Sequence, residues 1–258
     1  MTQHTPSPNK IALITGGSRG LGKSMALHLA DRGVDIVFTY RSGASEAQEL
    51  LSELRGRGRK AAALALDVGD SGSFPAFISA LTAELATTFG RDRFDFLVNN
   101  AGVGVHAGFT QTSESQLDDL FRIHFKGPFL LTQGLLPLIV DGGRILNVST
   151  GLTRMTIPGY AAYAAMKGAI EVLTRYQAKE LGARRITVNV IAPGAIATDF
   201  GGGAVRDNAQ VNGFIASQTA LGRVGLPDDI GGAVALLLGP EAGWVNAQRI
   251  EISGGQML

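Results

Sequence analysis

The chain contains no cysteine, which excludes disulfide bonds, thiolate metal sites and cysteine nucleophiles. Histidine is also scarce, with four in the chain, and none stands in a metal-ligand spacing such as HExxH. We therefore expect no metal in the chemistry of this protein. A chain without cysteine suits a reducing compartment, and we predict a cytoplasmic location.

Long apolar runs and an excess of one charge are missing as well. The formal net charge is +1, so nothing indicates a nucleic-acid partner. The most apolar stretch, residues 127–140, is shorter than the ~20 residues that a bilayer span needs, and glycine and proline interrupt it. The N-terminal residues do not resemble a signal peptide, and we expect residues 1–9 to form a disordered lead-in. No membrane partner is predicted.

Short apolar runs alternate with longer helical patterns along the rest of the chain. The runs that predict strands are 10–14, 35–40, 61–66, 94–99, 144–149, 187–192 and 249–252. The patterns that predict helices are 20–32, 45–57, 71–89, 114–140, 160–181 and 228–238. Strand–helix–strand repetition at this spacing implies parallel strands with right-handed crossovers. We predict one α/β domain over residues 10–258, a doubly wound parallel sheet of about seven strands with helices on both faces.

A glycine-rich turn, Thr-Gly-Gly-Ser-Arg-Gly-Leu-Gly at residues 15–22, follows the first predicted strand. Glycines let a backbone turn sharply and approach a pyrophosphate closely, and the next helix offers its free N–H groups to the anion. We interpret the turn as a dinucleotide-binding site; a purely structural turn is the alternative. The residues predicted to bind the cofactor here are Gly16, Ser18, Arg19, Gly20, Leu21 and Gly22.

The end of the second predicted strand indicates which dinucleotide binds. NAD-preferring sites usually carry an acidic residue there to hold the ribose 2′-hydroxyl. Here the position holds Tyr40, with Arg41 next to it and Arg19 in the glycine turn. Guanidinium groups donate paired hydrogen bonds to phosphate. The pattern predicts NADP(H) in preference to NAD(H), unless both arginines are only solvated surface residues.

Tyr163 and Lys167 stand four residues apart at the start of a predicted helix, so they share one helix face. Reduction of a carbonyl leaves an alkoxide that must be protonated, and a positioned phenol can do this. An ammonium ~4 Å from a phenolate is worth about 4 kcal/mol at an effective dielectric of ~20, or about 3 pKa units, which burial opposes in part. The pair predicts acid–base chemistry; an amphipathic surface pair is the alternative.

Together these stretches resemble the short-chain dehydrogenase/reductase family in its compact, Rossmann-only form, and in particular 3-oxoacyl-carrier-protein reductase-like ketoreductases. Three further stretches carry the resemblance: Asp67-Val68, Asn99-Asn100-Ala101-Gly102, and Pro193-Gly194 followed by Thr198. The order and spacing of all these motifs cover nearly all of residues 10–255. The resemblance implies a single Rossmann-type catalytic domain that transfers hydride between a nicotinamide and a carbonyl or alcohol carbon.

The resemblance also implies roles for individual residues. Tyr163 is expected to be the general acid or base, and Lys167 to lower its pKa and hold the nicotinamide ribose. The other residues expected to bind the cofactor are Asp67 and Val68 beside the adenine, Asn99, Ala101 and Gly102 at the back of the groove, and Pro193, Gly194, Ile196 and Thr198 at the carboxamide. A homotetramer is expected from the resemblance alone.

Two positions depart from the family pattern. The Ser that polarises the carbonyl lies thirteen residues before the Tyr, and here that position is Thr150, preceded by Ser149. Either hydroxyl can serve, and we leave the choice open. A common Asn is replaced by His124, which can donate and accept hydrogen bonds and can take a charge near neutral pH. His124 is predicted either to join a proton relay or to be a buried core residue.

We predict an NADP(H)-dependent oxidoreductase that reduces a modest, uncharged carbonyl compound to an alcohol, or catalyses the reverse. An NADP(H)-binding regulatory protein of the same fold with little or no turnover is the alternative. Residues 200–217 begin with three consecutive glycines after a strand end, where such sheets bind their ligands. We predict either a mobile flap over the substrate or an ordinary surface insertion there.

Overall fold

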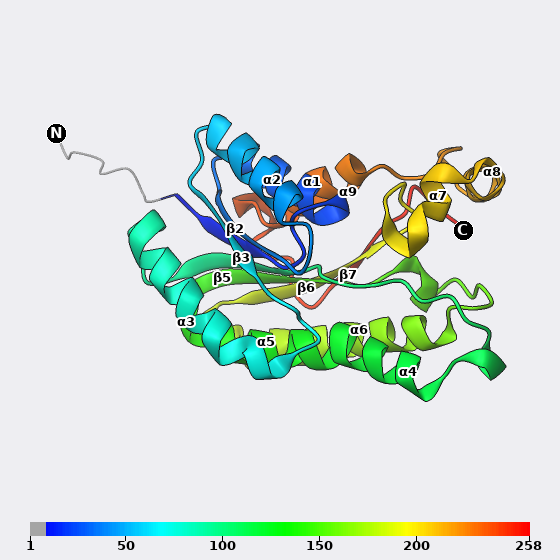
Figure 1. The fold of residues 1–258 in the computed structure, drawn as a ribbon, viewed down its shortest axis with the longest axis horizontal. Helices are drawn as coiled ribbons and strands as arrows, with labels where there is room; N and C mark the ends of the chain where they lie inside the picture. Colours follow the sequence, from blue (N-terminus) through cyan, green and yellow to red (C-terminus); the bar gives the residue numbers. More distant parts are fainter. Residues whose placement is uncertain (1–8) are drawn as a thin grey trace.

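The computed structural model describes residues 9–258, and a seven-stranded sheet forms its middle layer (Figure 1). All neighbouring strands are parallel, in the order β3-β2-β1-β4-β5-β6-β7. The strands are β1 (Ile11–Ile14), β2 (Asp35–Tyr40), β3 (Ala61–Ala65), β4 (Phe94–Asn99), β5 (Ile139–Val148), β6 (Thr187–Pro193) and β7 (Arg249–Ile252). The predicted fold class is confirmed.

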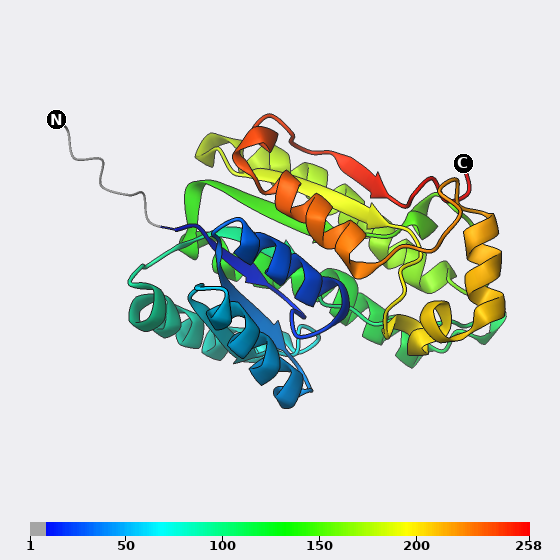
Figure 2. The same ribbon diagram turned by 90° about the horizontal axis from the view of Figure 1, so that it is seen from above.

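Helices cover both faces of the sheet (Figures 1 and 2). One face carries α1 (Gly20–Asp31), α2 (Ala44–Gly56) and α9 (Pro227–Leu237). The other carries α3 (Phe74–Glu84), α4 (Glu114–Phe121), α5 (Gly127–Leu135) and α6 (Ala161–Glu180). Among residues 9–258, no helix is long and apolar enough to cross a membrane.

Two apolar cores lie between the layers, and each of the strands β1 to β6 contributes to both because its side chains alternate between the faces. In β1, Ala12 and Ile14 pack into one core while Ile11 and Leu13 pack into the other. All four residues are almost completely buried. A strand covered on both faces has no solvated side, which explains why the strand sequences are apolar runs without alternation.

The stretch expected to be one helix, residues 114–140, is divided in the structure. After α4 the chain forms a π-helical turn, Arg122–Lys126, then α5, and a short 3₁₀ turn ends the helical path at Leu138. β5 already begins at Ile139. A π-turn holds one residue more than an α-turn, and it therefore changes which side chains face the sheet. His124 is the middle residue of this turn.

The chain after β6 forms two short helices beyond the end of the sheet (Figure 2). A 3₁₀ turn, Phe200–Gly203, leads into α7 (Ala204–Asp207) and α8 (Ala209–Ser217). The base of this excursion is closed by a parallel bridge between Ile196 and Gly225. Residues 200–217 are therefore mostly helical, and some of them line the cavity described below.

The predicted lead-in, residues 1–9, lies outside the described residues except for Asn9. The carbonyl oxygen of Asn9 accepts a hydrogen bond of 3.0 Å from Arg91 Nη1. Its side-chain Nδ2 lies 3.4 Å from Asp35 Oδ2. The described part of the chain is thus already attached to the sheet at Asn9.

Candidate active site

A cavity of about 520 Å³ opens at the carboxyl ends of the strands, and it extends from the glycine turn to α8. Strand order reverses between β1 and β4, and sheets of this kind bind ligands at such a switch point. Every residue predicted for the site lines the cavity except Asn99. Residues drawn from widely separated motifs are therefore brought together in one place.

The glycine turn forms a closely packed cradle. Gly16 has a φ of +65°, and a Cβ there would lie 3.0 Å from Ala101 Cα. A Cβ on Gly22 would lie 2.2 Å from the Gly16 carbonyl oxygen. The side chain of Asn100 donates to the carbonyl oxygens of Thr15 at 2.9 Å and Gly16 at 3.0 Å. The backbone is thus held at the start of α1, whose first turn contains no acidic residue, and it fits a phosphate anion.

Arg19 and Arg41 both line the cavity, together with Tyr40 at the end of β2. Both arginines are exposed, and neither forms an ion pair within residues 9–258. A neighbouring acid, Glu46, is fully exposed, and its pKa is lowered by its own backbone amide and by the Ser45 hydroxyl, with a smaller contribution from Arg19. Two cations without partners fit a 2′-phosphate group well.

Asn99 and Asn100 divide the role expected of Asn99. Asn99 is buried inside the sheet, where its Nδ2 donates to Asn147 Oδ1 at 2.9 Å and to Thr132 Oγ1 at 3.0 Å. It links β4 to β5 and to α5, and it does not line the groove. Asn100 makes the contact with the cradle instead, and sequence reasoning missed it. Its position next to Asn99 was the available signal, because adjacent side chains of a strand point to opposite sides.

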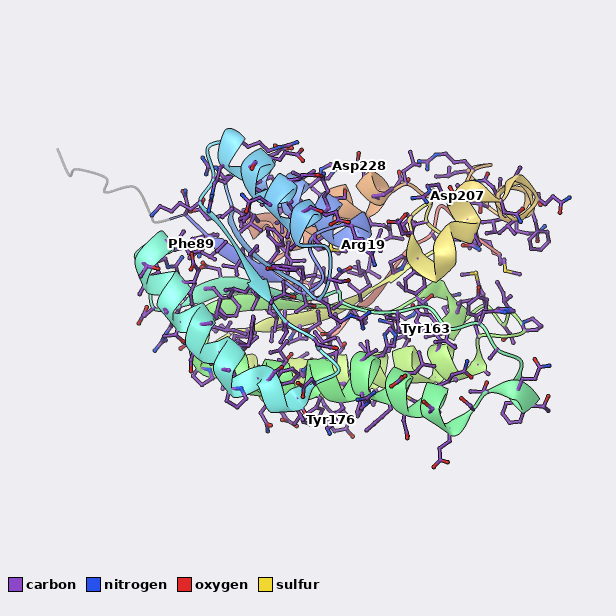
Figure 3. All side chains as sticks on the ribbon, in the orientation of Figure 1. Arg19, Phe89, Tyr163, Tyr176, Asp207 and Asp228 are labelled. Carbon is purple, nitrogen blue, oxygen red and sulfur yellow. The ribbon has the colours of Figure 1, made fainter. Side chains whose placement is uncertain are left out.

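Tyr163 and Lys167 lie on the first two turns of α6, and both are buried. Tyr163, on α6, and Arg19, which directly precedes α1, belong to segments on opposite faces of the sheet (Figure 3). Lys167 Nζ donates to the carbonyl oxygen of Val148 at 2.8 Å and lies 5.8 Å from the centre of the Tyr163 ring. Burial lowers the pKa of Lys167 to about 8.

The structure corrects the expectation that Lys167 lowers the pKa of Tyr163 and that burial opposes this shift only in part. Burial raises the pKa of Tyr163 well above its usual value of 10, because a phenolate would lose its hydration. A contact with the Thr150 side chain lowers that pKa in part, and the nearby Tyr160 raises it. The desolvation that was expected to oppose the shift in part is therefore the larger effect. At neutral pH the phenol keeps its proton.

The two candidate hydroxyls face different ways. Ser149 Oγ donates to Glu171 Oε1 at 2.6 Å, and this carboxylate does not line the cavity. The Thr150 side chain faces Tyr163, and its Oγ1 accepts a hydrogen bond of 3.3 Å from the Leu152 N–H. The geometry therefore favours Thr150 as the hydroxyl that meets a carbonyl oxygen beside the phenol.

His124 lies in the π-turn and is buried directly behind Tyr163. The two rings meet edge to face, with centroids 5.2 Å apart at an angle of 88°. His124 Nε2 lies 2.9 Å from the Val103 carbonyl oxygen and 3.4 Å from the Val103 N–H, and the shorter contact favours the tautomer with the proton on Nε2. Burial and the charge of Lys167 lower the pKa of His124 to about 2. The imidazole is thus neutral, and its buried Nδ1 is an acceptor without a partner among the described residues.

The substrate side of the cavity is apolar. Its lining comes from three segments of the chain, and includes Val103, Leu152, Met155, Ile157, Phe200, Val205 and Ile215. The Tyr163 and Phe200 rings lie 5.9 Å apart across the opening. The segment that begins at Phe200 therefore covers the reacting end of the cavity, while its mobility stays a prediction.

Known proteins similar to this chain show the family to which it belongs. A family model described as enoyl-(acyl carrier protein) reductase matches residues 16–257. The chain belongs to the short-chain dehydrogenase/reductase family. A short-chain type dehydrogenase/reductase of Picea abies is 36% identical over 260 residues, covering 96% of this chain and 92% of the relative. The predicted family is confirmed.

Two other similar proteins have more specific names. A tetrahydroxynaphthalene reductase of Pestalotiopsis fici is 36% identical over 264 residues, covering 98% of this chain and 93% of the relative. The crystal structure of an angucycline C-6 ketoreductase with bound NADP matches with a TM-score of 0.91 at 33% identity, covering 96% of this chain and 95% of that one. The similarity to both extends over nearly the whole short-chain dehydrogenase/reductase chain.

Proposed function

We propose that this short-chain dehydrogenase/reductase is an NADPH-dependent ketoreductase that reduces a carbonyl group on a polycyclic, uncharged substrate. The observation that carries the proposal is the buried set of Tyr163, Thr150 and Lys167 at one end of a cavity whose other end holds two unpaired arginines. Hydroxyl groups at one end and cations at the other suit a carbonyl and a phosphorylated dinucleotide, respectively.

The fit of NADP(H) rests on the cradle, which a Cβ at Gly22 would fill, and on Arg19 and Arg41. When bound, NADPH supplies the hydride. The residues that would hold it are those named from the sequence: the glycine turn at the pyrophosphate, Asp67 and Val68 at the adenine, Lys167 at the ribose, and Ile196 and Thr198 at the carboxamide. The similar angucycline ketoreductase, with bound NADP, supports the choice of cofactor.

The residues of the chain would divide the acid chemistry between them. Thr150 donates a hydrogen bond to the substrate carbonyl oxygen and polarises it. Tyr163 donates its proton to the same oxygen as negative charge develops there. Its raised pKa keeps the phenol protonated at neutral pH, which suits the direction of reduction. Lys167, with a pKa of about 8, remains mostly cationic near neutrality and faces the forming phenolate.

His124 would act in restoring the proton to Tyr163. Its Nδ1 is a buried acceptor without a partner in the described chain, next to the Tyr163 ring. A single water between this nitrogen and Lys167 would link both groups to the phenol. The imidazole would therefore orient water as a neutral acceptor, and it would not carry the proton as a cation.

The substrate class follows from the lining and from the similar proteins. Apolar side chains and the Phe200 ring suit a flat, uncharged ring system. The names of the similar proteins refer to a tetrahydroxynaphthalene and to an angucycline. We therefore favour bicyclic and larger aromatic ketones over short aliphatic ones.

The assembly and location complete the proposal. Exposed apolar side chains of α4, α5 and α6 include Leu117, Phe121, Phe129, Val172 and Tyr176. A second group, Leu236 and Trp244, lies at and beyond the end of α9. Two separate apolar surfaces suit a homotetramer, and a chain without cysteine suits a reducing cytoplasm. Light scattering of the purified protein measures the mass of the assembly.

NADPH and NADH oxidation over a panel of tetralones and aliphatic ketones tests the function. Tyr163→Phe should lower kcat by about 10²- to 10⁴-fold while NADPH binding persists, because only the proton donor is lost. Tyr176→Phe, on the exposed side of α6, is the matched control and should retain full activity. Binding of NADPH without turnover of any ketone by the intact protein would favour the regulatory alternative.

A further inference from the structure

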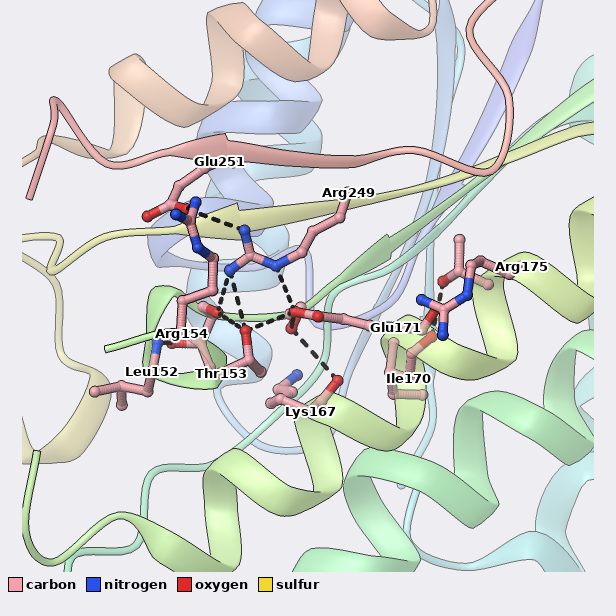
Figure 4. Close-up of polar contacts among 12 residues, drawn as sticks. Leu152, Thr153, Arg154, Lys167, Ile170, Glu171, Arg175, Arg249 and Glu251 are labelled. Carbon is pink, nitrogen blue, oxygen red and sulfur yellow. Dashed lines mark hydrogen bonds and ion pairs between the residues drawn. The ribbon is translucent and has the colours of Figure 1, made fainter. Parts of the chain in front are cut away.

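A charged network that does not line the cavity connects α6 with β7 (Figure 4). Glu171 is on α6, four residues after Lys167 and eight after Tyr163, while Arg249 and Glu251 are on β7. The Arg249 side chain is 19% exposed and that of Glu171 is 14% exposed, so the pair is shielded from most solvent. Such a pair fixes geometry more firmly than an exposed one.

Arg249 contacts both elements that carry the catalytic groups. Its Nε donates to Glu171 Oε1 at 2.8 Å, and its Nη2 donates to the carbonyl oxygen of Thr150 at 3.3 Å. Nη1 donates to Glu251 Oε2 at 3.0 Å, which holds the guanidinium in position from its own strand. A planar guanidinium with fixed donors therefore spans the distance between α6 and the backbone of Thr150.

Two hydroxyls complete the link between these elements. Thr153 Oγ1 accepts from Arg249 Nη2 at 3.0 Å, and it lies 3.0 Å from the Thr150 carbonyl oxygen and 2.8 Å from Glu171 Oε1. Ser149 Oγ donates to the same carboxylate oxygen at 2.6 Å. Ser149 and Thr153, which flank Thr150 in the chain, are thus tied to the helix that carries Tyr163 through Glu171, which does not line the cavity.

We propose that Arg249 and Glu171 are positioning residues that hold the Thr150 hydroxyl against the Tyr163 phenol. Neither residue lines the cavity, so neither touches substrate or cofactor. The Thr150 peptide follows the end of β5, and the contacts of its carbonyl set the direction of its side chain. This role rests on the proposed ketoreductase function, because it concerns the carbonyl oxygen that the two hydroxyls meet.

The test is a double-mutant cycle with Thr150→Val. Arg249→Gln should lower kcat for ketone reduction about tenfold, with the KM for NADPH unchanged, because one charge-assisted hydrogen bond on the Thr150 loop is lost. In the Thr150→Val background the same change should cost less than about twofold, because the hydroxyl that it positions is already absent. Equal losses in both backgrounds would overturn the proposal.

A second variant and a matched control make the cycle independent of folding defects. Thr153→Val removes the hydroxyl that bridges Arg249 and Thr150, and it should show the same dependence on Thr150 if Arg249→Gln fails to fold. Arg154→Gln is the control, because Arg154 also pairs with Glu251, at 2.8 Å, but its side chain is 66% exposed. It should leave kcat unchanged.

Two readouts separate this inference from the proposed function. In alcohol oxidation, Arg249→Gln should move the rising limb of the pH–rate profile to higher pH, as Thr150→Val does, because the contact that lowers the pKa of Tyr163 is weakened in both. A crystal structure of Arg249→Gln needs no turnover, and it should show Thr150 Oγ1 displaced from the phenol. An unmoved Thr150 would refute the positioning role, whereas an inactive parent protein would refute only the ketoreductase function.

Discussion

The phosphate cradle and the segment of residues 199–217 lie at opposite ends of one cavity and are built in opposite ways. In the cradle, Gly17 N–H donates to the Thr39 carbonyl oxygen at 2.8 Å, and neighbouring backbone would block side chains at Gly16 and Gly22. In the segment, Gly201 and Gly202 have open space where a Cβ would stand, and Phe214 is 62% exposed. One end is closely packed and the other is loosely attached.

The difference separates two kinds of functional information. A dinucleotide requires the same short backbone approach in any protein of this fold, so the cradle residues indicate the cofactor. The substrate requires only a shape, and many apolar side chains can supply one. The ion pairs that order the segment, from Arg206 to Asp199 and Asp207, are all on the surface and contribute little stability. The reaction type is therefore clearer than the substrate.

The largest effect is expected from a substitution that disrupts the closely packed phosphate cradle. Gly22→Ala places a Cβ 2.2 Å from the Gly16 carbonyl oxygen and 2.8 Å from Asn100 Nδ2. Because the nearest obstacle is backbone, the free energy of unfolding should fall by about 3 kcal/mol and NADPH binding should be lost. Urea unfolding and fluorescence titration with NADPH measure the two quantities. Unchanged stability together with normal binding would contradict this account of the cradle.

A smaller effect tests the charged edge of the same end. Arg41→Ala should weaken NADPH binding about 10- to 100-fold, because a hydrogen bond to a charged group is worth about 1.5–3 kcal/mol. NADH binding should hardly change, since NADH has no 2′-phosphate. Arg93→Ala, at an exposed position just before β4, is the control. An equal loss for both nucleotides would mean that Arg41 does not distinguish them.

The burial of His124 can be tested through the pH dependence of protein stability. The pKa of His124 is about 2, below the value of about 6.5 for an unfolded histidine. Between these two pH values the unfolded state binds a proton and the folded state does not. Stability should therefore fall as the pH drops below about 6.5, by about 1 kcal/mol per pH unit between pH 6 and pH 4. His124→Asn lacks this contribution, so the wild-type protein should lose stability relative to the variant over that range. A constant difference would mean that the imidazole titrates normally.

The smallest effect sharpens the comparison at the loose end. Gly213 lies inside α8, is exposed, and has nothing within 4 Å of the position of a Cβ. Gly213→Ala should raise the free energy of unfolding by about 0.4–1 kcal/mol, because alanine restricts the unfolded chain and favours a helix. The same substitution thus has opposite signs at Gly22 and Gly213. Thermal unfolding of both variants measures this contrast.

The sheet and most of the cavity were predictable because their signals are local. The glycine turn lies within eight residues, and Tyr163 and Lys167 are one helical turn apart. Apolar runs of strand length indicated the seven strands, although the boundary of β5 was missed because the π-turn and the 3₁₀ turn shorten the preceding helix. Local spacing reports local geometry reliably.

The features that escaped prediction depend on contacts between distant parts of the chain. Glu171 and Arg249 are 78 residues apart, and only the packing of α6 against the sheet shows that they pair. The signals were the acidic residue four positions after Lys167 and the alternation of Arg249 and Glu251 along a strand. Spacing also could not decide how Tyr163 titrates, because burial depends on every element around it.

The bridge between Ile196 and Gly225 has a consequence for how this chain can change over generations. Gly225 N–H donates to the Ala195 carbonyl oxygen at 3.0 Å and Ala197 N–H to the Gly225 carbonyl oxygen at 2.9 Å, so the chain leaves and returns at one closed point. Insertions, deletions or grafts between these residues would leave the register of the sheet intact. New substrates could thus be acquired by exchanging the part of this excursion that follows Thr198, without rebuilding the residues that bind the coenzyme.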